Sequence, residues 1–70
     1  MMPLTMVQTG ETVTIRKISG KDSVRLHLAE LGFVVEENVT VISRFGGSLI
    51  MQVKDSRIAI DQAMANRIFI

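Results

Sequence analysis

Hydrophobic and polar residues alternate near the start of the chain, in the run 11–18. Val13 and Ile15 are separated and flanked by Thr and Arg, which is the two-residue period of a strand with one buried face. Ile18 breaks this period, so we expect a bulge near Lys17. The first predicted element is therefore a half-buried strand.

The period changes to that of a helix after residue 21. Asp22 and Ser23 can each accept a hydrogen bond from the free amides of a first helical turn, so one of them should be the N-cap. Apolar residues then fall on one helical face, at positions 24, 28 and 31. Gly32 can take the left-handed conformation that ends helices. We expect a helix from Asp22 or Ser23 to about Leu31.

Runs rich in β-branched and aliphatic residues predict three further strands, at residues 39–44, 49–54 and 57–60. The first two runs are joined by Phe45–Ser48, which contains two glycines, and the last two by Asp55–Ser56. Such short polar or glycine-containing connections are typical of β-hairpins. The three runs therefore predict two successive hairpins.

The end of the chain predicts a short helical turn and a last strand. Asp61 can cap a turn over residues 62–65, Asn66 ends it, and 67–70 is a short apolar run. The whole pattern is mainly β, with about five strands, one α-helix after the first strand and a short helical turn before the last. We expect a small closed or nearly closed barrel, because closure removes exposed strand edges.

Length and composition limit the chain to one small domain. It has 70 residues, 47% of them hydrophobic, which is enough for one core and no more. Cysteine is absent, which excludes disulfides and thiolate metal sites. We expect a single domain over residues 1–70 that is held together by its apolar core alone.

Charge and hydropathy disfavour a nucleic-acid or membrane role. Eight Lys and Arg stand against seven Asp and Glu without a run of one sign, and Trp and Tyr are absent. Nucleic-acid binders usually cluster basic residues and add aromatic side chains for stacking. No apolar run approaches the roughly 20 residues of a membrane span, and no signal peptide is recognisable. We expect a cytoplasmic protein with no nucleic-acid partner and no direct membrane insertion.

The order of motifs along nearly the whole chain resembles the ferrous iron transport protein A family. The central part is Leu28–Val34, LAELGFV, which follows the capped helix and precedes a polar turn and two hairpins. Further matching residues are Gly10, Glu11, Ile15, Ile18, Arg25, Gly47, Arg57–Ile60, Ala63, Ile68 and Ile70. Val35-Glu36 stands where the family usually has Pro-Gly, and the Pro often found near Ser48 or Leu49 is missing. Val and Glu do not favour the turn geometry that Pro and Gly set.

This resemblance implies an SH3-like barrel and a non-enzymatic accessory role in bacterial ferrous iron uptake. The partner it implies is the cytosolic domain of a membrane ferrous iron permease that binds GTP, whose transport or assembly the protein would modulate. The same fold occurs as the C-terminal domain of metal-dependent repressors. The alternative is therefore a free-standing relative of that domain, which would act in metal-responsive transcription through a repressor because it has no DNA-reading helix.

Few residues could support catalysis or hold a resident metal. One histidine and no cysteine leave few ways to build a nucleophilic triad, so we expect no enzyme activity. His27 and Glu30 are one helical turn apart and could supply two ligands to a divalent ion. A stable site usually needs three or four ligands, and solvated helix surface is the more common role of such a pair. We expect no cofactor and at most weak or indirect association of divalent metal.

Exposed apolar and basic side chains are the candidate partner contacts. Leu26 falls almost opposite the apolar helix face, and with Phe33 it is expected to form an apolar patch. Phe45, at a hairpin tip, either anchors a partner or folds back over an open end of the barrel. Arg25 and Arg44 are also candidate partner contacts. A GTP-hydrolysing partner can use an arginine supplied in trans, but the sequence does not select among Arg16, Arg25, Arg44, Arg57 and Arg67, and solvated arginines are more common.

The sequence leaves two further modes of association open. The amino-terminal apolar residues Met1, Met2, Leu4 and Met6 can pack on the barrel or on a second copy of the chain, and methionine suits either because it fills irregular gaps. An open strand edge of the barrel could also accept another chain. A homo-oligomer is therefore one of the outcomes that the sequence allows.

Overall fold

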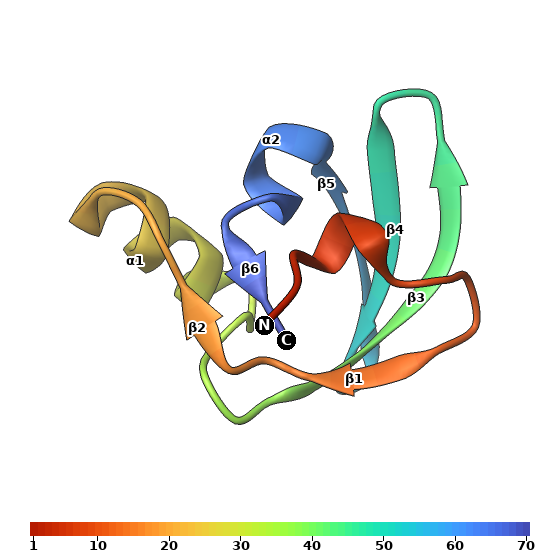
Figure 1. Cartoon of the computed structure of the whole chain (residues 1–70), viewed down its shortest axis with the longest axis horizontal. Coiled ribbons are helices and arrows are strands. Elements are labelled where there is room, and N and C mark those ends of the chain that lie inside the picture. The colour runs from red at the N-terminus through yellow and green to blue at the C-terminus, as the bar shows by residue number, and fades with distance from the viewer.

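The computed structural model describes residues 1–70 and shows six strands in two antiparallel sheets (Figure 1). The larger sheet has the order β1–β3–β4–β5, with β1 at Thr12–Thr14, β3 at Asn38–Phe45, β4 at Ser48–Val53 and β5 at Ser56–Asp61. The smaller sheet pairs β2 (Lys17–Ile18) with β6 (Ile68–Phe69). Helical segments are the 3₁₀ turn η1 (Leu4–Met6), α1 (Asp22–Glu30) and α2 (Gln62–Ala65). The mainly β, SH3-like architecture is confirmed, but the barrel is not closed.

The first predicted strand is in fact two strands, one in each sheet. Between β1 and β2 the chain crosses from one sheet to the other at Ile15 and Arg16. The Ile15 N–H donates to the Glu37 carbonyl at 3.0 Å, and the Arg16 N–H donates to the Phe69 carbonyl at 2.8 Å. Ile15 is fully buried at this crossing. The expected bulge near Lys17 is therefore a change of partner strand, and the count is six strands instead of about five.

Helix α1 begins at Asp22, and the prediction of a side-chain cap from Asp22 or Ser23 is wrong. The N-cap position is Lys21, and no side chain caps the helix. Asp22 is already the first helical residue, where its carboxylate lies near the positive end of the helix dipole. The apolar face is as predicted, because Leu28 is buried and Val24 and Leu31 pack against the core.

The end of α1 is a Schellman turn built on Gly32, as the glycine predicted. Gly32 has a φ of 102°, and its N–H donates to the Ala29 carbonyl at 2.9 Å. The Phe33 N–H donates to the Leu28 carbonyl, also at 2.9 Å. Phe33 and Leu28 are both fully buried, which is the apolar contact that accompanies this motif.

The two predicted hairpins and the helical turn after them are confirmed. In β4, burial alternates so that Leu49, Met51 and Val53 point into the core. A register shift in the β3–β4 pairing lies between Val41 and Ser43. At the start of α2 the Asp61 side chain accepts a hydrogen bond from the Met64 N–H at 2.7 Å, as expected of an N-cap.

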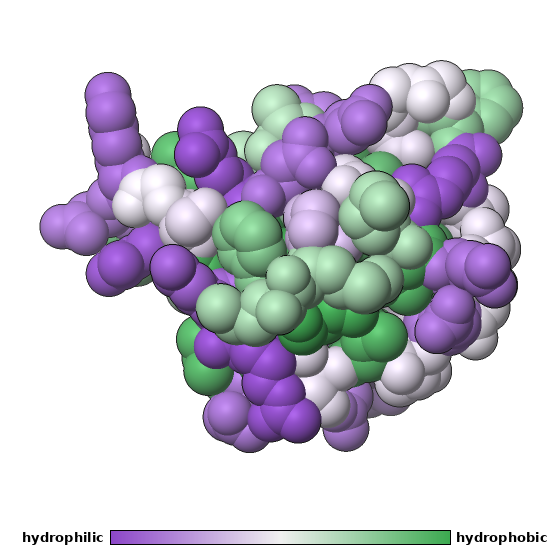
Figure 2. Space-filling model, in the orientation of Figure 1, coloured by the Kyte–Doolittle hydropathy of each residue, from purple (hydrophilic) through white to green (hydrophobic).

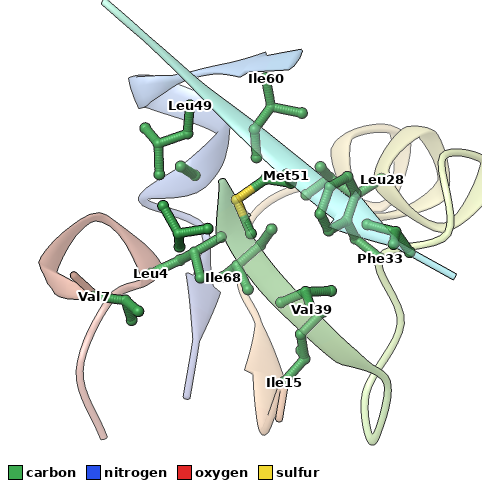
Figure 3. Close-up of a cluster of buried hydrophobic side chains, with 13 residues drawn as sticks. Leu4, Val7, Ile15, Leu28, Phe33, Val39, Leu49, Met51, Ile60 and Ile68 are labelled. Atoms are coloured by element: carbon green, nitrogen blue, oxygen red, sulfur yellow. The ribbon is translucent and has the colours of Figure 1, made fainter. Parts of the chain in front are cut away.

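The core is wholly apolar and draws on almost every element of the chain (Figure 3). Its thirteen buried residues include no polar or charged side chain: Leu4, Val7, Ile15, Leu28, Phe33, Val39, Val41, Leu49, Met51, Val53, Ile60, Ala65 and Ile68. Met51 lies among side chains from both sheets and from α1 (Figure 3). The interior is therefore filled by aliphatic packing.

The amino-terminal segment lies against β6, so the two ends of the chain are adjacent (Figure 1). Met2 and Ile70 exchange two backbone hydrogen bonds, of 3.2 and 2.9 Å, and Pro3 forms a bridge with Phe69. Figure 2 shows hydrophobic side chains gathered on the face that carries both termini. Met1 and Met6 are exposed. Pairing with β6 thus covers one edge of the smaller sheet.

Replacing Gly32 by alanine should lower the free energy of unfolding by about 2 kcal/mol, because a φ of 102° strains any L-residue. The new Cβ would also lie 2.9 Å from Val53 Cγ1. Chemical denaturation measures the change. Gly10→Ala is the control, because Gly10 has a φ of 92° and no atom within 4 Å of the added Cβ. Equal losses in the two variants would show that the contact with Val53 has no effect.

Replacing Glu36 by glycine should stabilise the fold. Glu36 has a φ of 78° in a turn closed by the Glu37 N–H and the Val34 carbonyl, 3.1 Å apart, and glycine takes this conformation without strain. Glu36→Ala is the control for the exposed ion pair between Arg16 and Glu36, whose closest N–O distance is 3.4 Å. Thermal unfolding should give Glu36→Gly a free energy of unfolding about 1 kcal/mol higher than that of Glu36→Ala. Equal stabilities of the two variants would contradict the argument.

Candidate partner-binding groove

An open groove of about 370 Å³ lies between α1, β2 and the segment that follows α1. Five of its six lining residues are hydrophobic, and the set is Ile18, Arg25, Ala29, Phe33, Val34 and Val35. Phe33 is fully buried, whereas Val34 and Val35 are 40% and 49% exposed. The groove is thus a shallow apolar surface whose base belongs to the core and whose walls are open to solvent.

The turn at Gly32 determines which residues line the groove. It directs Phe33 inward onto Leu28 and leaves the next two residues, Val34 and Val35, on the surface. On α1, Arg25 and Ala29 are four residues apart and therefore lie on the same side of the helix. The small side chain of Ala29 leaves room between the helix and the two valines. The same local geometry that ends the helix therefore builds this site.

Leu26 faces outward as predicted and is 63% exposed. It lies three residues before Ala29, so the two side chains are neighbours on the helix surface. The predicted patch of Leu26 with Phe33 is wrong, because Phe33 has no exposed surface. The residue after a Schellman glycine packs back on the last helical turn. Val34 and Val35 provide the exposed apolar surface instead.

Sequence reasoning missed Val34 and Val35 as candidate contacts. The signal was the run of three apolar residues, 33–35, between a helix-ending glycine and a polar turn. Only one of the three could enter a core already filled by the helix face. The other two, Val34 and Val35, remain partly exposed and line the groove.

The remaining candidate contacts do not gather at the groove. Phe45 is 80% exposed at the tip of the β3–β4 hairpin, so it does not fold back over the barrel. Figure 1 places this tip at the opposite side of the molecule from α1. Arg44 Nη2 donates to the carbonyls of Thr5, at 2.8 Å, and of Val7. Arg44 therefore fastens the amino-terminal segment to β3 through Nη2.

Arg25 is the charged member of the groove. Its Nη2 lies 3.5 Å from Asp22 Oδ1 in an exposed pair on the same helix. Such exposed pairs contribute little stability, so the guanidinium remains available to a partner. The groove can therefore combine burial of aliphatic surface with one charge-assisted hydrogen bond.

His27 and Glu30 lie on the exposed surface of α1. The structure contains no group of three or more His, Cys, Asp or Glu side chains that could hold a metal ion. The pair is thus limited to two ligands, fewer than a stable transition-metal site usually has.

None of the helices is both long and apolar enough to cross a membrane.

The fold and the groove define a small SH3-like domain with an exposed apolar groove. The profile of the FeoA domain matches residues 2–70. The chain therefore belongs to the FeoA family. This family consists of small SH3-like accessory domains related to ferrous iron transport, and it is not a known enzyme family. No curated protein sequence matches the chain.

Two FeoA crystal structures are similar over nearly the whole chain. An iron uptake regulatory protein, FeoA, has a TM-score of 0.88 at 25% identity, with 96% of this chain and 89% of that chain covered. FeoA of Stenotrophomonas maltophilia in complex with zinc has a TM-score of 0.84 at 25% identity, with 99% and 88% covered. That protein is described as a prokaryotic SH3 domain protein and a candidate activating factor for ferrous iron transport.

A manganese-dependent transcriptional repressor shares the fold. Its TM-score is 0.85 at 20% identity, and the match covers 94% of this chain and 38% of the repressor chain. A structure of a manganese-dependent transcriptional repressor in complex with manganese gives a TM-score of 0.85 at 20% identity, with 94% of this chain and 33% of that chain covered. At this identity the likeness concerns architecture only. The repressor has a large part that this chain does not match.

Titration with Zn²⁺ or Fe²⁺ should give binding no tighter than about millimolar, the range of loose carboxylate sites. The physical reason is that no third ligand accompanies His27 and Glu30. Calorimetry measures the affinity, and His27→Ala is the control that removes the strongest transition-metal ligand of the pair. Micromolar binding that His27→Ala abolishes would show that a complete site exists at this helix.

Proposed function

We propose that this chain is a non-enzymatic accessory protein of bacterial ferrous iron uptake. It acts in the cytoplasm, binds the cytosolic part of a GTP-dependent ferrous iron permease and modulates its transport or assembly. Membership of the FeoA family supports the iron-transport context. The observation that carries the binding role is the open groove with five hydrophobic lining residues out of six.

The groove suits an apolar segment of a partner protein. Val34, Val35 and Leu26 are 40%, 49% and 63% exposed, and covering each of them would contribute about 1 kcal/mol of binding free energy. Arg25 at the rim can add a hydrogen bond to a carboxylate or carbonyl of the partner. The surface is small, so the contact would be of the modest affinity that regulatory interactions use.

A binding protein without catalytic groups can still change the activity of a transporter. It does so when it binds one state of the partner more tightly than another, because the tighter binding shifts the equilibrium toward that state. A tenfold difference in affinity corresponds to about 1.4 kcal/mol. In this proposal the differential contact is made by the groove.

The alternative function is that of a free-standing relative of the repressor C-terminal domain, acting in metal-responsive transcription. Its support is the shared fold at 20% identity. The FeoA profile and the two FeoA structures instead favour the transport role. A binding experiment with each class of partner separates the two functions.

Val35→Asp should weaken binding to the purified cytosolic domain of the permease at least tenfold, because the interface would bury an unpaired carboxylate. Calorimetry gives the affinity, and NMR shift mapping should place the contact at Arg25, Ala29 and Val34. Phe45→Ser is the control, since it removes a more exposed apolar side chain far from the groove.

Three results would count against the proposal. No binding by the unchanged protein, together with unchanged GTP turnover of the permease domain, would remove the function itself. If Phe45→Ser lost binding and Val35→Asp kept it, the contact would lie at the hairpin tip and not at the groove. Tight binding to a metal-dependent repressor would favour the alternative function.

A further inference from the structure

Strand β5 is an open edge of the larger sheet. It pairs with β4 on one side, and no strand lies on its other side. The remaining element beside it is α2, which follows it directly along the chain. Arg57, Ala59 and Asp61 are all exposed. The outer side of β5 is therefore accessible to another chain.

The hydrogen-bond alternation fixes which residues present free backbone groups at this edge. Val53 and Ser56 are paired across the two-residue turn, and the Gln62 N–H donates to the Gly47 carbonyl at 2.9 Å. Even-numbered residues of β5 therefore bond to β4, because antiparallel ladders bond alternate residues. The N–H and C=O groups of Arg57 and Ala59 and the N–H of Asp61 point away from the sheet, and no turn, loop or cap hydrogen bond uses them. The Asp61 carbonyl, at the N-cap of α2, accepts the first hydrogen bond of that helix.

The other strand edges are less suited to accept a chain. The outer side of β6 is covered by the amino-terminal segment, through the paired bonds of Met2 with Ile70. Strand β1 has three residues and β2 has two. β5 has six residues and is exposed along its solvent face. It is the longest unpaired edge in the molecule.

The side chains of this edge are complementary to themselves. If two β5 strands pair antiparallel about Ala59, Arg57 of each copy faces Asp61 of the other. Ala59 then meets its own counterpart on the twofold axis, where a methyl group allows close approach. Opposite charges on facing residues stabilise a strand pair, and like charges destabilise it. This register places no like charges opposite each other.

Both charged groups are free to form the pair. Neither Arg57 nor Asp61 has an ion-pair partner within the chain, although three other ion pairs occur. Arg57 uses Nε to donate to Gln52 Oε1 at 3.1 Å, which leaves its terminal nitrogens. Asp61 uses Oδ1 to cap α2, which leaves Oδ2. The pairing therefore requires no intramolecular hydrogen bond to break.

We propose that β5 is a self-association edge at which two copies of this chain pair antiparallel about Ala59. The two larger sheets then form one continuous sheet, with backbone hydrogen bonds donated by the N–H groups of residues 57, 59 and 61 of both copies. The Asp61 carbonyl accepts the Arg57 N–H of the other copy with its second lone pair, beside its bond within α2. Two Arg57–Asp61 ion pairs lie on the solvent face, and Ile58 and Ile60 extend the apolar face. The partner strand belongs to a second copy, because Arg57 and Asp61 face each other when this strand pairs antiparallel with itself. The proposal is independent of the permease-binding groove, which contains no residue of β5.

The first test is amide hydrogen exchange measured by NMR on the unchanged protein at low and high concentration. The amides of Arg57, Ala59 and Asp61 should exchange fast in dilute solution and slow at about millimolar concentration, where weak edge contacts are populated. Amides of Ile58 and Ile60, which already bond to β4, should not change. A monomer at about millimolar concentration, or protection confined to other residues, would overturn the proposal.

The second test uses variants followed by sedimentation equilibrium. Ala59→Pro removes a donor that points outward and leaves the β4 ladder intact, because proline is tolerated at strand edges; it should abolish the dimer. Arg57→Glu sets like charges against Asp61 and should weaken dimerisation about tenfold. Lys17→Glu makes the same charge change on an exposed residue of β2 and should leave dimerisation unchanged.

The two variants keep the proposal falsifiable if one of them does not fold. Circular dichroism shows whether each remains folded. A folded Ala59→Pro or Arg57→Glu that dimerises like the unchanged protein would overturn the proposal. So would an equal loss of dimer in Lys17→Glu, because the effect would then be one of net charge and not of this edge.

Discussion

The close approach of Gly32 to Val53 positions α1 on the sheet, and most of the molecule's functional surface follows from it. A Cβ at residue 32 would lie 2.9 Å from Val53 Cγ1, so glycine alone lets the end of the helix rest on β4. The positive φ at the same residue reverses the chain and sends Phe33 into the core. Both demands fall on one residue, and both require the absence of a side chain.

The groove is a direct consequence of that reversal. Once Phe33 is buried against Leu28, the next residues must run over the surface toward β3, and Val34 and Val35 stay partly exposed. The turn that follows keeps a positive φ at Glu36 although the side chain does not favour it. The backbone geometry is therefore maintained by the surrounding fold, through the hydrogen bond from the Glu36 N–H to the Ile15 carbonyl at 2.8 Å. A strained turn beside an apolar surface is a common arrangement at binding sites.

Local patterns in the sequence predicted the elements that local interactions determine. The strands β3 to β5, the end of α1 at Gly32 and the Asp61 cap of α2 all depend on residues within a few positions of each other. The crossing at Ile15 could not be predicted, because alternation shows that a residue points inward and not which sheet its N–H joins. The hydrogen bonds of Arg44 could not be predicted for a related reason. Its acceptors, Thr5 and Val7, are almost forty residues away in sequence.

The main error in predicting the site was to place Phe33 on the surface and to overlook Val34 and Val35. Helical periodicity ends at Gly32, so it cannot assign the three apolar residues that follow. The Schellman motif does assign them, because the residue after the glycine packs on the last helical turn. Capping geometry therefore carries information about a binding surface that hydrophobic periodicity lacks.

The groove and the β5 edge use different physical means and do not compete. In the two proposals, the groove would bind through side chains of α1, β2 and the segment after α1, whereas the edge would bind through backbone groups of β5. A pair of chains joined at β5 therefore keeps two grooves, related by a twofold axis. A partner that also carries two copies of its binding segment would engage both grooves, and the second contact would form at a high effective concentration. Two weak surfaces on a domain of 70 residues can thus combine into a stable assembly, which neither surface is large enough to produce alone.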